Sequence, residues 1–509
     1  MTTRKLPDYI EDYGEVKPFQ GVFSDCGVKS RKAVKLTSVT PGEEKVLGSL
    51  DEAFEKLGMK DGMTISFHHH LRNGDHVLNM VLEGLAKRGL KDLTVAASSI
   101  FPVHAPLVDH MKNGVVTGLV ANYISGPVAE AISRGVLSKP VVMQTHGGRA
   151  RAIESGDLAI DVAFIASPTA DTYGNINGVD GKAACGSLGY AVSDAEYASK
   201  TVALTDHLVP YPACPIEISQ VFVDYVVQVD SIGDPKGIVS GTTKITKDPV
   251  ALKIAKMAVE VIKASGLVKN GMSFQTGAGG TSLAVAAELK ELMKREGVVG
   301  SFAAGGITGY IVEMLEEGLF ETLFDVQCFD LKAVESYRNN PRHQFMSASM
   351  YGNPHTKGAV VNNLDIMVLG ATEIDTDFNV NVTTGSNGVI MGGSGGHSDT
   401  AAGSKLALVV TNLMKARLPI IKDQVTTITT PGESVDVVVT ERGIAVNPRR
   451  TDLLEKLGKA KLPLMTIGEL KTLAEKITGV PKAIQTSEKI VAVVEYRDGR
   501  VIDVVRGVS

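Results

Sequence analysis

The sequence predicts an α/β protein made of two related units with largely parallel sheets, and two observations lead to this prediction. First, one pattern occurs twice, as IDVAFIASPTADTYGNIN at 160–177 and as LDIMVLGATEIDTDFNVN at 364–381. Second, short apolar runs bounded by Gly, Pro or Asp alternate with helix-like segments, which is typical of buried parallel strands joined by helices. The repeat indicates a duplicated unit of roughly 200 residues, an ordinary domain size.

The repeat keeps its polar residues at one constant offset along the chain. The matched pairs are Asp161 and Asp365, Asp171 and Asp375, Thr172 and Thr376, Asn175 and Asn379, and Asn177 and Asn381. The carboxylate Glu373 falls opposite Thr169. DGMTISF at 61–67 also resembles NGMSFQT at 270–276, and a looser match sets EAISRGVL (130–137) beside VEMLEEGL (312–319). We therefore expect corresponding strands and loops in the two units.

The first unit is expected at 45–244, after an N-terminal arm at 1–44 that packs over this unit or over another subunit. SLDEAFEKLGMK predicts a helix, MTISFHHH a strand, HVLNMVLEGLAKRGL a helix with apolar residues three to four apart, and DLTVAASSI a strand. GVVTGLVAN, KPVVMQTH, DVAFIASP and TVALTD predict further buried strands, and VFVDYVVQVDSIGD closes the unit.

The second unit is expected at 245–509. It opens with a long amphipathic helix whose start signals are Asp248 and Pro249. The alternation then repeats in SFQTG, LAVAAELKELMKREG, GSFAAGGIT, TLFDVQCF, LDIMVLGAT, VDVVVTERGIAV and KIVAVVEYRDGRVIDVVRGV. The alternation of strand-like and helix-like segments therefore predicts that each unit is an α/β domain.

Composition narrows the class of protein. The 509 residues are 44% hydrophobic and carry a formal net charge of −5, so the chain can bury large cores and has no basic field for nucleic acid. The four cysteines, Cys26, Cys185, Cys214 and Cys328, lack metal or redox spacing and indicate a reducing compartment. The charged N-terminus and the lack of long apolar runs predict a soluble cytoplasmic protein without a membrane span.

A glycine-rich turn between a predicted strand and helix is a candidate anion site. SFQTGAGGTSLAV places Gly277, Gly279 and Gly280 at this junction, where backbone N–H groups and a helix N-terminus can bind an anion or a thioester oxygen. The segment lacks the Lys of a P-loop and the third spaced glycine of a dinucleotide fingerprint. A turn that only lets the backbone pack closely is the alternative.

Basic side chains crowd the corresponding junction of the first unit. Neighbouring histidines on a strand point to alternate sides, and no Cys or HExxH spacing accompanies them, so we expect no metal ion. The cluster predicts a cationic loop for a polyanionic substrate, with a solvated or capping loop as the alternative. Its members in SFHHHLRNGDH are His68, His69, His70, Arg72 and His76.

Two further features predict carboxylate chemistry. Arg149, beside His146 in QTHGGRA, can hold a carboxylate bidentately, although an interdomain ion pair explains it equally well. Glu373 lies within two residues of the end of an apolar strand, where side chains face the ligand crevice of an α/β sheet. The N–H groups of 392–396 in GGSGGHSD can approach a carbonyl oxygen as an oxyanion hole requires. Together they predict acyl transfer; a turn or cap carboxylate is the alternative.

Several long motifs together resemble the citrate lyase alpha chain family of the CoA-transferase superfamily. SFQTGAGG, ATEIDTDFNVN and GGSGGHSDTAAG are similar to superfamily motifs, and SFHHHLRNGDH, SSIFPVHAPLV, QTHGGRA and ASPTADTYGNINGVDGKAACGSLGYA are similar to motifs of the family. The resemblance runs from about residue 45 to the C-terminus. It implies two domains of the CoA-transferase (NagB/RpiA-like) type and a citrate:acetyl-carrier-protein transferase, which exchanges acetyl for citryl on a thioester and releases acetate.

The resemblance also implies partners. These are a lyase beta chain and a small gamma acyl carrier protein, whose phosphoribosyl-dephospho-CoA arm is bound here and covalently attached there. The substrates are then citrate and an acetyl thioester, no cofactor is held covalently by this chain, and an oligomer is expected. Collapse of the tetrahedral intermediate expels a thiolate, a good leaving group because a thiol has a pKa of about 8.5.

Site residues follow from the same resemblance. Glu373, Gly395 and Gly396 are the predicted catalytic residues. Contacts to the thioester arm are predicted for Gly277, Gly279, Gly280, Asn387, Gly392 and Gly393, and contacts to citrate for His68, His69, Arg72 and Arg149. Glu373 aligns with a nucleophilic glutamate of other CoA-transferases, whereas the citrate lyase branch resembles enzymes that act through a ternary complex. Its covalent role is therefore open, and Ser386 in GSNG stands where another branch has its glutamate.

Two other functions fit parts of the pattern. An acyl-CoA hydrolase or a transferase for another carboxylic acid would share the glycine loops and Glu373 but would not need citrate. A non-catalytic sensor on the related sugar-phosphate-binding fold would carry a DNA-binding N-terminal module, and MTTRKLPDYIEDYGEVKPFQG has no helix-turn-helix pattern.

Overall fold

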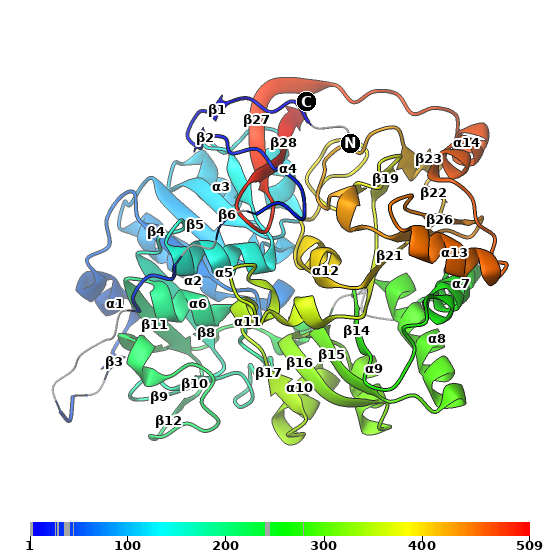
Figure 1. Cartoon of the computed structure of the whole chain (residues 1–509). Coiled ribbons are helices and arrows are strands. Elements are labelled where there is room, and N and C mark those ends of the chain that lie inside the picture. Colours follow the sequence, from blue (N-terminus) through cyan, green and yellow to red (C-terminus); the bar gives the residue numbers. More distant parts are fainter. Residues whose placement is uncertain are drawn as a thin grey trace.

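Two large sheets form the centres of the two halves of the molecule in the computed structural model (Figure 1). The structure describes residues 4–25, 27, 30–34, 41–43, 45–239, 245–277 and 279–508. Cys26, parts of the predicted arm and the predicted boundary residues 44 and 240–244 lie outside the described residues. The predicted α/β class with largely parallel sheets is confirmed.

The first sheet is parallel except for its outermost pair. The two strands at one edge are antiparallel to each other, and every other neighbouring pair is parallel. In spatial order the strands are β28 (Val501–Val508), β27 (Thr486–Glu495), β7 (Val141–Met143), β6 (Val116–Ala121), β5 (Leu93–Ala97), β4 (Thr64–Phe67), β8 (Val162–Ser167), β11 (Lys200–Thr205), β13 (Tyr225–Gln228) and β3 (Val46–Leu47). The helices between them are α1 (Leu50–Leu57), α2 (Val77–Lys87), α3 (Leu107–Lys112), α4 (Pro127–Ser133), α5 (His146–Ser155) and α6 (Ala191–Tyr197).

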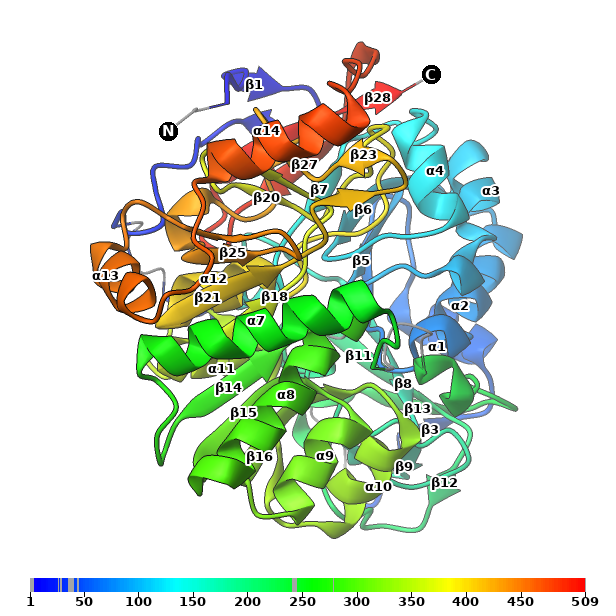
Figure 2. The same ribbon diagram turned by 90° about the vertical axis from the view of Figure 1, so that its right-hand side faces the viewer.

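The second sheet repeats this order. In space its strands are β17 (His343–Phe345), β16 (Phe320–Cys328), β15 (Gly300–Ile307), β14 (Ser273–Thr276), β18 (Ile366–Leu369), β21 (Leu406–Val410), β25 (Val437–Val439) and the antiparallel β26 (Ile444–Val446). Its helices are α7 (Pro249–Ser265), α8 (Gly280–Glu296), α9 (Gly309–Glu316), α10 (Leu331–Asn339), α11 (Ala348–Gly352), α12 (His397–Gly403), α13 (Thr451–Lys459) and α14 (Ile467–Thr478). Figure 2 shows α7 and α8 in front of these strands.

Helix boundaries follow the local signals in the sequence. Asp248 caps α7 by accepting from the N–H of Val250, Pro249 is the first helical residue, and Gly266 ends the helix in the left-handed conformation. These are the start signals predicted for the second unit. Ser49 caps α1 in the same way.

The internal repeat is visible in hydrogen bonds. Asp171 Oδ1 accepts from the N–H of Asn175 at 3.1 Å, and Asp375 Oδ1 accepts from the N–H of Asn379 at 2.9 Å. Each clamp closes a small sheet, formed by β10 (Ile176–Asn177), β9 (Thr169–Asp171) and β12 (Leu208–Val209) in one unit and by β20 (Val380–Asn381), β19 (Glu373–Asp375) and β24 (Ile421–Lys422) in the other. β4 and β14 also occupy equivalent positions, so the duplication is confirmed. The looser match is wrong, because α4 follows β6 whereas α9 follows β15, which occupies the place of β5 in the order of the second sheet.

The C-terminal hairpin corrects the predicted extent of the second unit. β27 pairs in parallel with β7, as Val493 lies opposite Val142, and the red hairpin lies with the strands of the first sheet in Figure 1. Residues 486–508 therefore belong to the first sheet, although they follow the second unit in sequence. The division of the remaining chain near residue 245 stays a prediction.

The described part of the N-terminal arm lies across both halves. It contains a small hairpin of β1 (Tyr9–Ile10) and β2 (Gly14–Glu15), and it then pairs with β28, where the N–H of Phe19 donates to Val501 at 2.8 Å. Arg31 forms an ion pair with Glu154 of α5. The arm thus covers the first unit as predicted, but it also contacts the second, through the N–H of Val22 and Glu433.

The two halves share their core and their polar contacts. Buried side chains of both sheets, such as Phe164 and Phe274, belong to one apolar cluster. Asp399 of α12 accepts from Thr145 Oγ1 and from the N–H of Gly147, both at 2.9 Å. The halves are therefore fixed relative to each other. Within the described residues, no helix is both long and apolar enough to span a bilayer.

Candidate active site

The three histidines of the HHH motif have different surroundings. The strand β4 ends at Phe67, so the histidines lie in the loop that follows. His68 Nε2 accepts from the N–H of Ala166 and His70 Nε2 from the N–H of Tyr190, and both are buried in the first unit. His69 instead stacks on the Tyr190 ring, with centroids 4.5 Å apart. The histidines therefore follow the predicted strand instead of lying on it, and the absence of a metal ion stays a prediction.

Aromatic rings and the guanidinium of Arg72 lie around His69. His146, the first residue of α5, lies 4.5 Å from Tyr190 and 5.7 Å from His69 between ring centroids. Arg72 lies over two rings, 5.4 Å from Phe101 of the first unit and 4.7 Å from Phe329 of the second. The predicted citrate residues His69 and Arg72 are therefore brought together.

The second unit supplies two side-chain amides and a phenol beside these residues. Gln275, at the C-terminal end of β14, donates to Tyr351 Oη at 2.8 Å, and Gln327 of β16 donates to the carbonyl of His69 at 2.9 Å. Gly396 lies directly against the Tyr351 hydroxyl, which a Cβ would overlap. We call His69, Arg72, His146, Tyr190, Gln275, Gln327 and Tyr351 the inter-unit cluster. Sequence reasoning missed its glutamines, which lie near the ends of β14 and β16, and its tyrosines, of which Tyr190 precedes α6 and Tyr351 lies in α11.

The inter-unit cluster has hydrogen-bonding capacity that the protein does not use. Four of its buried atoms have no hydrogen-bond partner among the described residues, namely Arg72 Nη1, His146 Nδ1, Gln275 Oε1 and Gln327 Oε1. Leaving buried polar atoms unpaired costs about 1–3 kcal/mol each, and such groups in a native protein indicate a role beyond packing. They suit a ligand rich in oxygen atoms.

Burial keeps the imidazoles of this region neutral. It lowers the pKa of His146 to about 3, with the charge of Arg149 adding to the effect. Burial likewise lowers the pKa of His69 well below its usual value, helped by the charges of His146 and Arg72. An anion bound beside these imidazoles would favour their protonated forms and so oppose the lowering of their pKa values.

Glu373 is enclosed in the hairpin of the second unit. Its side chain has 0% exposure, and Lys422 Nζ forms an ion pair with Oε1. Oε2 accepts from the N–H of Thr426 at 2.7 Å and from Asn381 Nδ2 at 3.0 Å, while Oε1 accepts from Ser386 Oγ at 2.8 Å. Burial alone would raise the pKa of Glu373, but the hydrogen bonds from Lys422, Thr426 and Asn381 and the lysine charge outweigh it and lower the pKa.

Lys422 and Thr426 were not singled out from the sequence. They lie about fifty residues after Glu373 in IIKDQVTT, and only the parallel pairing of β24 with β19 brings them to the carboxylate. Among the described residues, no hydrogen bond or ion pair joins Glu373 to the inter-unit cluster. The carboxylate is therefore ionised and held, rather than exposed as a free nucleophile.

The glycine loop at 277–280 and the glycine loop at 392–396 differ in how much space surrounds their glycines. Around Gly277 and Gly279 an added Cβ would meet no atom closer than 3.8 Å, and Gly279 precedes α8 without a side-chain cap. The N-terminus of α8 is thus open to an anion. At Gly392 and Gly393 a Cβ would overlap backbone carbonyls, and the N–H of Gly395 donates to Asn122 at 3.2 Å. This second loop docks the two units.

The remaining predicted residues lie apart from the inter-unit cluster. Arg149 donates from both terminal nitrogens to Asp194, at 2.8 and 3.0 Å, and the pair is buried in the first unit. This geometry fits the alternative of an ion pair, here within one unit. Asn387 is exposed and accepts from the N–H of Val389. Gly280 is the first residue of α8.

A buried polar network joins the units on another side. Asp325, Cys328 and His343 offer ligand atoms within 4.8 Å of one another. They already hydrogen-bond one another, with Asp325 Oδ2 2.9 Å from Cys328 Sγ and 3.0 Å from His343 Nε2. Nearby Tyr337 donates to Glu217 at 2.8 Å, and burial raises the pKa of Glu217 to about 7.

The family model and the sequence relatives of this chain point to one family. The family described as "Citrate lyase, alpha subunit (CitF)" matches residues 43–508. The citrate lyase alpha chain of Haemophilus influenzae is 52% identical, covering 92% of this chain and 94% of the relative. That of Escherichia coli K12 is 49% identical, covering 92% of each.

Solved structures agree. One from Streptococcus mutans, described as an alpha subunit of citrate lyase in complex with citrate, is 51% identical with a TM-score of 0.95 and covers 100% of this chain and 99% of its own. A 4-hydroxybutyrate CoA-transferase from Porphyromonas gingivalis shares the fold, with 17% identity, a TM-score of 0.54 and coverage of 85% of this chain and 96% of its own.

Proposed function

Because this chain belongs to the citrate lyase alpha subunit family, we propose that it is a citrate:acetyl-carrier-protein transferase. The reaction exchanges the acetyl group of a carrier thioester for citryl and releases acetate. The observation that carries this proposal is the inter-unit cluster, in which Arg72, His146, Gln275 and Gln327 each have a buried polar atom without a hydrogen-bond partner among the described residues. A tricarboxylate with a hydroxyl group matches that set of partners.

Citrate is proposed to bind with carboxylates on Arg72, His69 and His146 and with its hydroxyl facing the amide oxygens of Gln275 and Gln327. A citrate carboxylate attacks the acetyl thioester carbonyl, and the tetrahedral oxyanion needs preorganised N–H donors. Its collapse expels the thiolate and leaves a mixed anhydride of citrate and acetate. The thiolate then attacks the citryl carbonyl of that anhydride, and acetate leaves. Orientation and charge supply most of the rate enhancement in such a step.

The thioester arm is proposed to approach over the open turn at Gly277 and Gly279. Space above these glycines and the uncapped N-terminus of α8 suit a phosphate or a thioester oxygen. We propose that this arm is the phosphoribosyl-dephospho-CoA group of a gamma acyl carrier protein, and that a lyase beta chain completes a cytoplasmic oligomeric complex. The two units are proposed to be NagB/RpiA-like domains.

Glu373 is proposed to act as a held carboxylate in the direct, ternary-complex route. Its enclosure by Lys422, Thr426, Asn381 and Ser386 supports this route over a covalent one, because a nucleophile must first lose these partners. Trapping with hydroxylamine or borohydride under turnover separates the routes. An adduct on Glu373 would establish the covalent route instead.

An exchange assay tests the function. Purified protein is given acetyl carrier protein or acetyl-CoA, with and without citrate, and released acetate and citryl thioester are measured. Arg72→Met should raise the KM for citrate at least about tenfold, as expected for a lost charge-assisted contact of 1.5–3 kcal/mol. Arg134→Met is the matched control, since Arg134 lies on the surface in an i,i+4 pair with Glu130.

The outcomes separate the candidate functions. Acetate release that needs citrate supports the transferase. Release without citrate would establish a hydrolase or a transferase for another acid. Loss of activity in Glu373→Gln would place Glu373 in the mechanism, whereas full activity would leave it a structural carboxylate.

A further inference from the structure

The segment 425–428, which holds Glu373 from one side, is held from the other side by the N-terminal arm. Thr426 gives Glu373 two hydrogen bonds, from its N–H at 2.7 Å and from Oγ1 at 3.1 Å. Arg4 Nη2 donates to the carbonyl of Val425 and, at 3.5 Å, to that of Thr426. The guanidinium of Arg4 therefore contacts the backbone of the same residue, Thr426, that donates to Glu373.

The C-terminal hairpin completes this attachment. Arg4 Nε donates to Asp503 Oδ2 at 3.0 Å, and the same oxygen accepts from the N–H of Ile428 at 2.8 Å. Asp503 lies on β28 and is buried. Both termini of the described chain thus meet at the segment 425–428.

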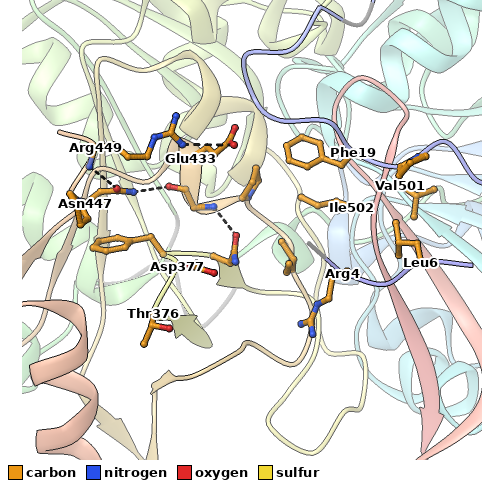
Figure 3. A pocket seen from close by; sticks show the side chains of 17 residues that line it. Arg4, Leu6, Phe19, Thr376, Asp377, Glu433, Asn447, Arg449, Val501 and Ile502 are labelled. Carbon is orange, nitrogen blue, oxygen red and sulfur yellow. Dashed lines mark hydrogen bonds and ion pairs between the residues drawn. The ribbon is translucent and has the colours of Figure 1, made fainter. Parts of the chain in front are cut away.

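A cavity lies between the arm and this segment. It encloses about 430 Å³, and Figure 3 shows Arg4, Leu6 and Phe19 of the arm on one side of it and Thr376 and Asp377 of the hairpin tip on another. Ile428 also lines it. On the side of the arm, the hydrogen bonds of Arg4 and Asp503 attach this segment.

The first unit lacks this attachment. Asp171 accepts from the N–H of Ala213 as Asp375 accepts from that of Val425, so Ile216 corresponds to Ile428. Ile216 is 50% exposed, whereas Ile428 is 6% exposed. The arm and the hairpin therefore cover only the copy of the segment that faces a carboxylate.

We propose that Arg4 is a positioning residue for Glu373, acting through the backbone of Val425 and Thr426. This inference rests on the proposed function, because it concerns the carboxylate of that site. Loss of Arg4 frees the segment, and the hydrogen bonds from Thr426 to Glu373 weaken. The arm, for which the sequence indicates no role, is then part of the catalytic unit.

The test compares Arg4→Met and Arg4→Lys with Lys5→Met in the full chain. Lys5 is the neighbouring exposed cation and serves as the matched control. Hydrogen–deuterium exchange of the peptide with Thr426 and Ile428 should be about tenfold faster in Arg4→Met, the size expected for a lost hydrogen bond to a charged group. The peptide of the first unit with Ile216 should not change.

Activity and labelling provide the functional readouts. In Arg4→Met, kcat for citrate-dependent acetate release should fall about tenfold with the KM for citrate within twofold, and the acid limb of the pH profile should move to higher pH. Carbodiimide labelling of Glu373, read by mass spectrometry, should be faster. Arg4→Lys should recover part of each effect, because an ammonium can still contact Asp503 and one carbonyl.

The results separate two kinds of failure. Unchanged exchange and labelling in Arg4→Met would overturn the positioning role, as would faster exchange with unchanged kcat and pH profile. If wild type releases no acetate with citrate, the proposed function fails on its own, and labelling of Glu373 alone then decides whether Arg4 positions the carboxylate.

Discussion

Replacing Lys422 by Met tests whether an ion pair holds Glu373 ionised inside the protein. Breaking a buried pair costs about 3–5 kcal/mol when the remaining charge stays buried. The lower end applies here, because Glu373 keeps hydrogen bonds from Thr426, Asn381 and Ser386 and the Lys422 side chain is 12% exposed. We expect a loss of about 3 kcal/mol at pH 7.5.

The pKa of Glu373 determines how the stability difference between wild type and Lys422→Met changes with pH. In wild type the pKa of Glu373 lies below its ordinary 4.5, so its contribution to stability is present above pH 4.5 and is lost as pH falls through the folded-state pKa. Without Lys422, burial dominates and raises the pKa, so stability is lost as pH rises. The difference between wild type and Lys422→Met should therefore shrink by more than half near pH 4.5.

Chemical denaturation followed by circular dichroism measures both effects, and a double-mutant cycle with Glu373→Gln isolates the pair. The loss of stability in the double variant should be about 2 kcal/mol smaller than the sum of the losses in the two single variants. A loss below about 1 kcal/mol that does not depend on pH, with no coupling in the cycle, would refute the ion pair as the reason that Glu373 stays ionised.

Three further predictions follow from the inter-unit contacts. Citrate binding near neutral pH should take up protons, because an anion raises the low pKa of His146; calorimetry in buffers of different ionisation enthalpy measures this, and no uptake would place citrate elsewhere. Glu217→Gln should stabilise the protein by roughly 2 kcal/mol more at pH 8 than at pH 4, since the raised pKa of about 7 means that stability is lost as pH rises through 7; equal effects in denaturation at both pH values would contradict this. Gly396→Ala should cost about 1–3 kcal/mol by overlap with the Tyr351 hydroxyl, whereas Gly458→Ala, in open space on α13, should not destabilise.

Local chemistry explains which parts of the fold were predictable. Caps such as Asp248 and the apolar strands act over a few residues, so their signals are complete in the sequence. The duplication was also visible, because the Asp171 and Asp375 clamps need the same residues at the same spacing. The position of β27 in the first sheet is not visible in the sequence. Its alternating residues fit any sheet edge, and only tertiary packing selects β7 as its partner.

The candidate site was predictable only in part, for the same reason. His69 and Arg72 stand in a dense basic motif and were recognised. Gln275 and Tyr351 stand alone in the sequence, and only the fold brings the end of β14 to α11, where Gln275 donates to Tyr351. Gly393 shows a second difficulty, because its glycine run also lets the backbone of Asn122 approach, and the sequence alone does not separate this packing role from an oxyanion hole.

The difference between the two copies of the hairpin argues that the carboxylate and its lysine depend on each other. β24 and β12 pair with their hairpins in the same register, so Lys422 stands where the first unit has Val209, as Glu373 stands where it has Thr169. A carboxylate at position 169 beside Val209 would lack a lysine partner, and a lysine at position 209 beside Thr169 would lack a carboxylate partner; a buried charge without its partner costs several kcal/mol. Thr169→Glu in the first unit should therefore destabilise the protein, and adding Val209→Lys should recover much of the loss. A double variant no more stable than Thr169→Glu would show that other contacts, such as those of Thr426, are what tolerate the carboxylate in the second unit.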